Sequence, residues 1–391
     1  MSDREFDLVL YGATGFVGKL TAHYLSTAAP EGARIALAGR SVDKLVAVRD
    51  GLGPAVAGWE LIVADAADET HLDAMVRRTR VVVTTVGPYA QYGLPLVAAC
   101  AKAGTHYADL TGETLFVRDC IDRYHDVAVG TGARIVNSCG FDSVPSDLSV
   151  WVTHKQTLAD DTGELTDTTL VAKAKGGLSG GTVATMLGQI EAVAADRSLA
   201  KVVTDPYALS PDRALEPYVG RQSDQALQQA SSIDASLDGW VATFLMASYN
   251  TRVVRRSNAL LGYPYGKNFR YREVMSAGRS RLAPVIAAGV AGTLAVGATV
   301  GSFALRGPVP RLVERILPKP GSGPSEKTRN TGWFTMSTYA HTTSGAKYRT
   351  IFAAHGDPGY QATSVMLGEA GLALAFDGDA LAEATGVVTP A

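Results

Sequence analysis

The chain has 391 residues, of which 46% are hydrophobic and 19% are charged, and its formal net charge is −2. A chain of this length predicts two domains rather than one, and the near-neutral charge without a basic array argues against a nucleic-acid partner. The three cysteines, Cys100, Cys120 and Cys139, match no metal-binding motif, so we expect no metal site. Because cysteine is sparse and no apolar signal region opens the sequence, we expect a cytoplasmic protein.

The first recognisable feature is a glycine-rich stretch that follows a short apolar run at residues 8–10. Its glycines are spaced three apart, and a helical pattern comes directly after them. Strand, glycine turn and helix together predict a dinucleotide-binding loop, with the pyrophosphate at the helix N-terminus. The GxxGxxG spacing is more typical of NADP enzymes. The predicted cofactor loop comprises Gly12, Ala13, Thr14, Gly15, Phe16, Val17 and Gly18.

The residues after the second predicted strand, 34–39, favour NADP(H) over NAD(H). An NAD site carries Asp or Glu about 20 residues past the glycines, where it binds the ribose hydroxyl. This chain has Arg40 and Ser41 there, followed by Lys44. A guanidinium fork pairs well with the oxygens of a 2′-phosphate. We therefore expect these three residues to bind NADP(H); the alternative is that Arg40 is a solvated surface residue.

Strand patterns alternate with helical patterns between residues 5 and 140. Further strands are predicted at 61–63, 81–85, 106–110 and 134–138, and helices at 42–52, 69–78, 94–103 and 115–127. This alternation predicts an α/β fold with a doubly wound parallel sheet, a Rossmann domain. Ligands bind beyond the carboxyl ends of such strands. We therefore expect Asp65 near the adenine, and Val86, Gly87 and Pro88 near the nicotinamide.

The pattern changes after Asp147. A strand is predicted at 168–175, an irregular excursion at 205–240, two antiparallel strands at 333–341 and 347–354, and a final helix at 360–376. These elements predict a Rossmann domain made of residues 1–150 and about 356–391. An α+β substrate and dimerisation domain with an antiparallel sheet is then inserted at 151–355.

A second glycine-rich turn, 176–181, precedes a predicted helix. We expect Ser179, Gly180, Gly181 and Thr182 to form a helix N-terminus that binds substrate or phosphate. The GxSxG match around Ser179 also fits a hydrolase. That reading needs His341 or His355 as a base and leaves the dinucleotide loop unexplained.

Two stretches of unusual composition follow each other. Residues 252–281 contain eight Lys or Arg against one acid, Glu273, and we expect either a contact with an acidic partner or a solvated basic face. Residues 282–305 carry no charge, and their length would span a bilayer. We favour a buried or dimer-interface helix, hence a homodimer, because alanine and glycine suit close helix packing. Peripheral membrane contact is the main alternative, and a true span is the least favoured.

Several motifs of the first half resemble those of the saccharopine dehydrogenase-like oxidoreductases: 12–18, 38–41, 86–89, 92–93, 104–113 and 139–147. Those at 179–184, 252–257 and 318–321 look like the trans-acting enoyl reductases of actinobacterial lipid polyketide assembly. The resemblance covers nearly the whole chain. It implies reduction of an enoyl intermediate with a lipid-like acyl chain, held on the acyl-carrier domain of a polyketide synthase in phthiocerol-type lipid biosynthesis.

Enoyl reduction needs a proton at the α-carbon and stabilisation of the thioester oxygen. Tyr89 is our first candidate donor because it follows the predicted nicotinamide loop, and Tyr92, His106 and Tyr107 are further candidates. Any of them could instead be an ordinary core residue. Two other functions stay open: an NADP-dependent dehydrogenase of an amino acid or imine, and a non-catalytic NADP-binding lipid-surface protein.

Overall fold

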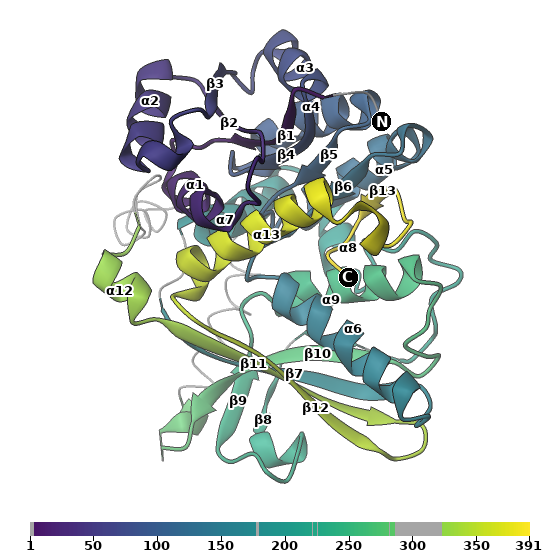
Figure 1. Ribbon diagram of the computed structural model, residues 1–391. Helices are drawn as coiled ribbons and strands as arrows, with labels where there is room; N and C mark the ends of the chain where they lie inside the picture. Colours follow the sequence, from purple (N-terminus) through teal and green to yellow (C-terminus); the bar gives the residue numbers. More distant parts are fainter. Residues whose placement is uncertain (1–3, 177–179, 221, 225, 281, 286–322) are drawn as a thin grey trace.

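The computed structural model describes residues 4–176, 180–220, 222–224, 226–280, 282–285 and 323–391 (Figure 1). The chain forms two β-sheets, sheet A and sheet B, with helices packed on them (Figure 1). Sheet A belongs to the first half and receives the end of the chain, whereas sheet B is built from the middle of the sequence.

Sheet A has seven strands in the order β13-β6-β5-β4-β1-β2-β3, and all its pairings are parallel. This confirms the predicted doubly wound parallel sheet. The strands are β1 (Phe6–Tyr11), β2 (Ile35–Gly39), β3 (Glu60–Val63), β4 (Thr79–Thr84), β5 (His106–Ala108), β6 (Arg134–Val136) and β13 (Gly386–Val388).

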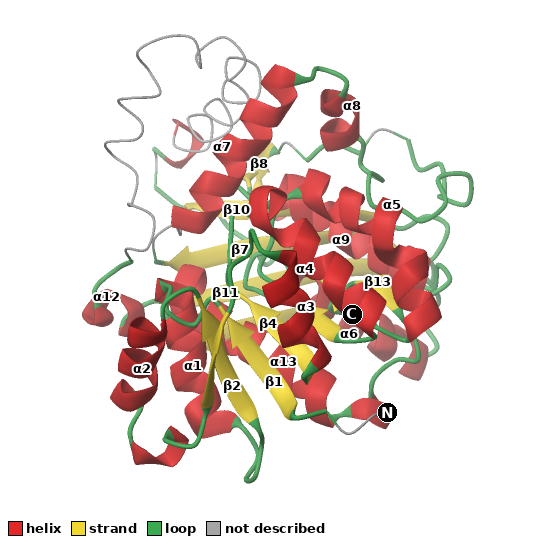
Figure 2. Ribbon diagram, turned by 90° about the horizontal axis from the view of Figure 1, so that it is seen from above, coloured by secondary structure: helices red, strands yellow, loops and turns green. Residues whose placement is uncertain are grey.

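Helices cover both faces of sheet A because its central strands are apolar on both sides (Figure 2). In β1, Leu8 and Leu10 pack with one helix layer, and Val9 and Tyr11 with the other. The first layer contains α1 (Phe16–Ala28), α2 (Val42–Gly51) and α13 (Thr363–Phe376). The second contains α3 (Glu69–Arg77), α4 (Tyr89–Ala103) and α5 (Thr114–Thr131).

Sheet B has six strands in the order β12-β11-β7-β10-β9-β8. We expected an antiparallel sheet, but the pairing of β7 with β10 is parallel, so the sheet is mixed. A parallel pair needs a long crossover connection, and the chain between Lys175 and Arg270 provides it with helices and two further strands of the sheet. The strands are β7 (Leu165–Lys175), β8 (Leu227–Gln229), β9 (Trp240–Thr243), β10 (Arg270–Gly278), β11 (Trp333–Thr342) and β12 (Lys347–His355).

The inner face of sheet B, which points towards sheet A, is covered by α6 (Val144–Ala159) and α9 (Ala247–Leu260) (Figure 1). The remaining described helices of this half are α7 (Gly180–Ala195), α8 (Leu199–Thr204) and α12 (Glu326–Asn330). After β12 the chain returns to sheet A through α13 and β13. The residue boundaries that we predicted for the two domains stay a prediction.

Within the basic stretch 252–281, the three arginines on α9 are buried and match neither reading that the sequence suggested, whereas Lys267 and Arg270 are exposed. Arg252 forms an ion pair with Asp224. Arg255 donates to the carbonyls of Pro206 and Tyr271, both at 3.0 Å. These guanidinium groups serve as internal hydrogen-bond donors, so they form neither a solvated face nor a docking surface.

Arg256 of the same helix links the two halves. Its guanidinium donates to the carbonyl oxygens of Leu209 and Val387, both at 2.6 Å. Burial lowers the pKa of Arg256 to about 10, which still leaves it charged at neutral pH.

The uncharged segment 282–305 lies almost entirely outside the described residues. Within the part of the chain that the structure covers, no helix is long and apolar enough to cross a bilayer.

Candidate active site

The predicted cofactor residues lie in loops that leave the carboxyl ends of four adjacent strands. In spatial order these are β4, β1, β2 and β3. Residues 12–18 follow β1, Arg40 follows β2, Asp65 lies just beyond β3, and 86–88 follow β4. Because the strands are parallel, the four loops share one edge of sheet A. Doubly wound folds bind dinucleotides in the crevice at this edge.

The three glycines of the loop after β1 meet different constraints. Gly12 has a φ of 87°, and a Cβ there would lie 2.7 Å from Oγ1 of Thr85. A Cβ on Gly18 would lie 2.1 Å from the carbonyl oxygen of Gly12, so α1 can approach β1 only without a side chain there. Gly15 is exposed, and its Cβ would meet only the Gly12 carbonyl at 3.3 Å. The protein itself therefore needs Gly12 and Gly18, whereas the bare backbone of Gly15 suits a ligand.

The N-terminus of α1 suits a pyrophosphate. Gly15 is its N-cap and provides no capping side chain, and the first turn has no acidic residue. The free N–H groups of a helix N-terminus and the helix dipole attract anions. Residues Gly15, Phe16 and Val17 would hold the pyrophosphate by their backbones, which fits a dinucleotide cofactor.

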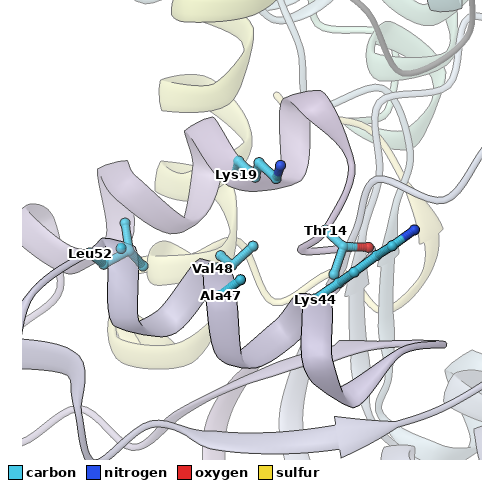
Figure 3. Close-up of a pocket in the computed structure, with 7 residues that line it drawn as sticks. Thr14, Lys19, Lys44, Ala47, Val48 and Leu52 are labelled. Carbon is cyan, nitrogen blue, oxygen red and sulfur yellow. The ribbon is translucent and has the colours of Figure 1, made fainter.

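Basic side chains surround the position expected for the 2′-phosphate. Arg40 and Lys44 are exposed, and neither forms an ion pair with any described residue. Lys44 also lines a surface cavity of about 490 Å³ between α1 and α2, together with Thr14 and Lys19. Figure 3 shows the Lys44 side chain extending alongside Thr14. These cations, with Ser41 half-buried between them, fit NADP(H) better than NAD(H).

Tyr11 is the last residue of β1, and the charges of Asp65 and Arg40 act on its hydroxyl group. Burial and the charge of Asp65 raise the pKa of Tyr11 to about 12, and Arg40 opposes this rise. The Asp65 carboxylate accepts the N–H of Ala67 at 3.0 Å, so it shapes the turn after β3 as well as facing the crevice.

The loop after β4 leads into α4 through a cis peptide bond between Gly87 and Pro88. Tyr89 begins α4, and its hydroxyl donates to the carbonyl of Thr84 and accepts the N–H of Leu110, both at 3.2 Å. Burial and Asp109 raise the pKa of Tyr89 well above its ordinary value. Through these hydrogen bonds Tyr89 connects β4 to the loop after β5, and its role as a proton donor stays a prediction.

His106 and Tyr107 are also held by internal hydrogen bonds. Nδ1 of His106 accepts the N–H of Arg134 at 3.0 Å. Burial and the charges of Arg134 and Arg80 lower the pKa of His106 to about 4, so it is neutral near pH 7. It is the first residue of β5, at the strand end opposite to the cofactor loops. The hydroxyl of Tyr107 donates to Asp109 at 2.9 Å inside the core.

Asp109 is the centre of a buried hydrogen-bond network. It accepts hydrogen bonds from the backbone N–H groups of Thr111 and Ser138, from the amide of Asn137 and from the Tyr107 hydroxyl, at 2.8–3.0 Å. Burial raises its pKa to about 6 in spite of these donors. The network fixes the turns that follow β5 and β6.

Ser138 extends this network towards α9. Its φ of 70° is in the left-handed region, which is uncommon for a residue with a side chain. Its hydroxyl forms a hydrogen bond with the hydroxyl of Tyr249 on α9. The turn after β6 is therefore tied to the half that contains sheet B.

Glu113 contacts the residues that directly follow the predicted nicotinamide loop. Its carboxylate accepts the N–H groups of Tyr89 at 3.0 Å and of Ala90 at 2.7 Å, and so it caps α4. Oε1 also accepts the hydroxyl of Thr185 on α7 at 3.4 Å. Burial raises the pKa of Glu113, although these N–H groups favour its ionised form. The spacing along the chain gave no sign of this long-range cap.

The predicted substrate turn is only partly described. Ser179 lies outside the described residues, and Gly180, Gly181 and Thr182 form the first turn of α7. Further along α7, Thr185 lies beside Gly112, where an added Cβ would be 3.8 Å from its methyl group and 3.1 Å from Cε of Met246. The start of α7 therefore adjoins the loop after β5.

Residues 8–136 match the family described as the saccharopine dehydrogenase NADP binding domain. A trans-acting enoyl reductase of Mycobacterium bovis is 52% identical over 393 residues, which cover 100% of this chain and 94% of that protein. A Mycobacterium ulcerans protein of the same name is 50% identical over 393 residues, with the same coverage. A Mycobacterium tuberculosis protein named for the same activity is 54% identical over 397 residues, covering 99% of this chain and 93% of that protein. The chain belongs to the trans-acting enoyl reductase family.

The fold agrees with this family assignment. The apo saccharopine dehydrogenase (L-Glu forming) of Saccharomyces cerevisiae superposes with a TM-score of 0.53 and 12% identity, covering 98% of this chain and 93% of that one. At this identity the similarity concerns the fold alone. The NADP binding domain and the relatives named enoyl reductases make this member of the trans-acting enoyl reductase family an NADP-dependent oxidoreductase, and its cofactor is NADP(H).

Proposed function

We propose that the protein uses NADPH to reduce the carbon–carbon double bond of an enoyl thioester carried on the acyl-carrier domain of a polyketide synthase. The observation that carries this proposal is the 50–54% identity, over nearly the full chain, to proteins named trans-acting enoyl reductases. The product is a saturated, lipid-like acyl thioester for lipid biosynthesis. A homodimer and a peripheral contact with a membrane, suggested by residues 282–305, remain predictions.

The reaction consumes NADPH and one proton and releases NADP⁺. The cofactor supplies a hydride for the β-carbon, so the chain must align the thioester and deliver a proton to the α-carbon. The residues proposed to hold the cofactor are 12–18, Arg40, Ser41, Lys44, Asp65 and 86–88. The backbone N–H groups in the first turn of α7 are proposed to bind the acyl substrate, at a helix N-terminus that favours negative charge.

The proton source is proposed to be Tyr92. It lies in the first turns of α4, directly after the loop expected to meet the nicotinamide. Its side chain is 43% exposed, and its hydroxyl makes no hydrogen bond to any described residue. By contrast, internal hydrogen bonds occupy the polar groups of Tyr89, Tyr107 and His106. A donor in the crevice needs a hydroxyl that can reach the substrate.

A saccharopine-type dehydrogenase was the main alternative, and a pair of substrate-binding arginines in the second half would have favoured it. Arg252, Arg255 and Arg256 are buried and bonded to Asp224, Gln222 and backbone carbonyls. They cannot bind a substrate carboxylate without breaking these bonds, so the α9 arginines lend this alternative no support.

The test follows NADPH absorbance after the protein is mixed with an enoyl thioester of N-acetylcysteamine. A second assay uses the same enoyl group on a holo acyl-carrier domain. We expect NADPH consumption and a saturated acyl product by mass spectrometry, with NADH much less effective. A saturated thioester is the blank. Tight NADPH binding without reduction of either enoyl thioester would rule out the proposed function.

A further inference from the structure

The outer face of sheet B, which points away from α6 and α9, carries a set of positively charged side chains. Side chains alternate between the two faces of a strand, and two contacts identify those on the outer face. Nε of Arg272 donates to Oγ1 of Thr169 at 3.0 Å, and the Arg349 guanidinium lies 5.5 Å from the centre of the Tyr339 ring. Thr169 and Tyr339 are paired in register. The set, here called the basic face, comprises Lys173, Lys175, Arg270, Arg272, Lys347 and Arg349.

The two ends of the basic face differ in how far acids neutralise it. At one end, Asp167 shares the face with Arg270, and a polar groove of about 410 Å³ lies between them and His341. At the other end, Lys173 and Lys175 are exposed, and neither forms an ion pair with any described residue. The one acid that β7 and β11 present on the outer face, Asp167, therefore lies at the end opposite to these two lysines.

Exposed apolar side chains lie among these charges. Trp333 is paired in register with Lys175 and is 39% exposed, and Ile351 on the neighbouring edge strand β12 is 53% exposed. An exposed tryptophan beside an exposed aliphatic side chain is typical of a protein–protein interface, in which Trp is enriched.

Two strands, β7 and β11, connect this end of the basic face along the chain to elements beside the crevice. After Lys175 the chain passes to α7, whose Thr185 contacts Glu113 beside the predicted nicotinamide loop. Before Trp333 the chain leaves α12, whose Arg329 guanidinium lies 5.3 Å from the ring of Phe16 in the pyrophosphate loop. Figure 1 shows α12 and the start of β11 on the side of the molecule where α1 lies.

We propose that the end of the basic face around Lys173, Lys175, Trp333 and Ile351 docks the acyl-carrier domain of the synthase, a compact domain with an acidic surface. The inference rests on the proposed function. Charge complementarity selects this occupant, because an acidic domain satisfies the lysines and is steered to them over distance. A second copy of this chain fits less well, since a two-fold axis would bring the same lysines together.

The first experiment measures docking without turnover. A holo acyl-carrier domain of a mycobacterial polyketide synthase is titrated into the full chain, and binding is followed by tryptophan fluorescence, with Trp333 as a built-in probe, and by calorimetry. We expect binding that weakens as salt is added. The variant Lys173→Glu/Lys175→Glu should bind at least about tenfold more weakly. The control, Arg77→Glu/Lys102→Glu, makes the same charge change at exposed positions of α3 and α4 and should bind as the wild type does.

The second experiment compares two substrates. The docking variant should lose about tenfold in kcat/KM for the enoyl group on the carrier domain, and keep its activity on the N-acetylcysteamine thioester. Binding of the carrier domain by a protein that reduces neither thioester would support the docking surface and reject the enoyl reductase function. Unchanged binding by the variant, or equal losses on both substrates, would overturn the docking proposal.

Two other occupants of the surface give distinct results. Binding of the wild type to vesicles of phosphatidylglycerol and phosphatidylcholine, but not to the carrier domain, would show a membrane-facing surface instead. A change in oligomeric state of the lysine variant during size-exclusion chromatography would show an interface between copies of the chain. Either result would overturn the proposal.

Discussion

The hydroxyl group of Thr185 lies 3.4 Å from Oε1 of Glu113, and this contact joins α7 to the loop between β5 and α5 beside the start of α4. Glu113 thereby connects three parts of the molecule: the helix that follows the predicted nicotinamide loop, its own loop after β5, and the helix proposed to bind substrate. A change of this carboxylate should therefore affect the geometry between cofactor and substrate more than the affinity for either.

The variant Glu113→Gln tests this positioning role. Its amide nitrogen cannot accept an N–H group, so either Tyr89 or Ala90 loses its acceptor, at a cost of about 1–3 kcal/mol. We expect kcat to fall about 10- to 100-fold, with the Kd for NADPH nearly unchanged because the phosphate sites lie on other loops. Steady-state kinetics and fluorescence titration measure both. Thr185→Val, which removes only the bond to α7, should mainly raise KM for the thioester; equal losses in kcat from both variants would contradict this division.

Cofactor selectivity should depend on Arg40 and Lys44. Replacing Arg40 with alanine removes a charge-assisted pair with the 2′-phosphate, worth about 1.5–3 kcal/mol. We expect the Kd for NADPH to rise about 10- to 150-fold and the Kd for NADH to stay within a factor of about two. Lys44→Ala should have the same direction and a smaller effect, because its ammonium group is a single point charge. Parallel titrations decide this, and an equal loss for both nucleotides would show that Arg40 does not contact the phosphate.

Gly15 and Gly18 offer a matched pair of substitutions in one loop. Gly18→Ala forces a methyl group to within 2.1 Å of the Gly12 carbonyl, so we expect a fall in melting temperature and in soluble yield. Gly15→Ala meets that carbonyl only at 3.3 Å, and a small shift relieves the contact. This variant should keep its melting temperature and lose affinity for NADPH. If Gly15→Ala binds NADPH normally, the pyrophosphate does not approach this backbone.

Substitutions of Tyr92 and Tyr89 should have different effects, the first on the catalytic rate and the second on stability. Tyr92→Phe removes the proposed proton donor, and we expect kcat to fall about 100-fold with little change in stability. Tyr89→Phe removes two internal hydrogen bonds near the core, so it should lower the free energy of unfolding by about 1–3 kcal/mol. A normal kcat in Tyr92→Phe would leave water or another group as the proton source. Urea unfolding and steady-state rates are the measurements.

Stability should depend on pH through Asp147. Burial raises the pKa of this carboxyl from its ordinary value of 3.8 to about 7. Between these values the folded protein holds a proton that the unfolded chain has lost, so the free energy of unfolding decreases as pH rises towards 7. Asp147→Asn should flatten this decrease by an amount on the order of 4 kcal/mol, since one pKa unit is about 1.4 kcal/mol. The exposed Asp73→Asn is the control, and a wild-type pH profile in Asp147→Asn would contradict the assignment.

The sequence predicts sheet A and the cofactor loops well because their signals are local. The apolar run of β1 and the glycines after it need no distant partner to be recognised. Helix α4 shows the limit: we predicted its start at Leu94, yet it begins at Tyr89 and contains Pro95. The earlier start depends on capping by Glu113, 24 residues away, which no local pattern reveals.

The arginines of α9 show a second limit. A run rich in Lys and Arg normally indicates solvent exposure, and composition alone cannot show that backbone carbonyls from distant loops surround Arg255 and Arg256. The same holds for Tyr89, whose hydroxyl partners come from β4 and from the loop after β5. The position of each residue in its motif predicts the element on which it lies. It does not predict the hydrogen-bond partners of its polar groups.

The bond from Arg256 to Val387 has a mechanical consequence. β13 is an edge strand of sheet A, and Arg256 fastens it to a helix that covers sheet B. The hydroxyl of Ser257 adds a second tether to Thr389 at 2.8 Å. Both tethers lie at the β13 edge, whereas the cofactor loops follow β1 to β4 towards the opposite edge. We therefore expect the β13 edge of sheet A to stay in contact with α9 when the two halves of the molecule move relative to each other.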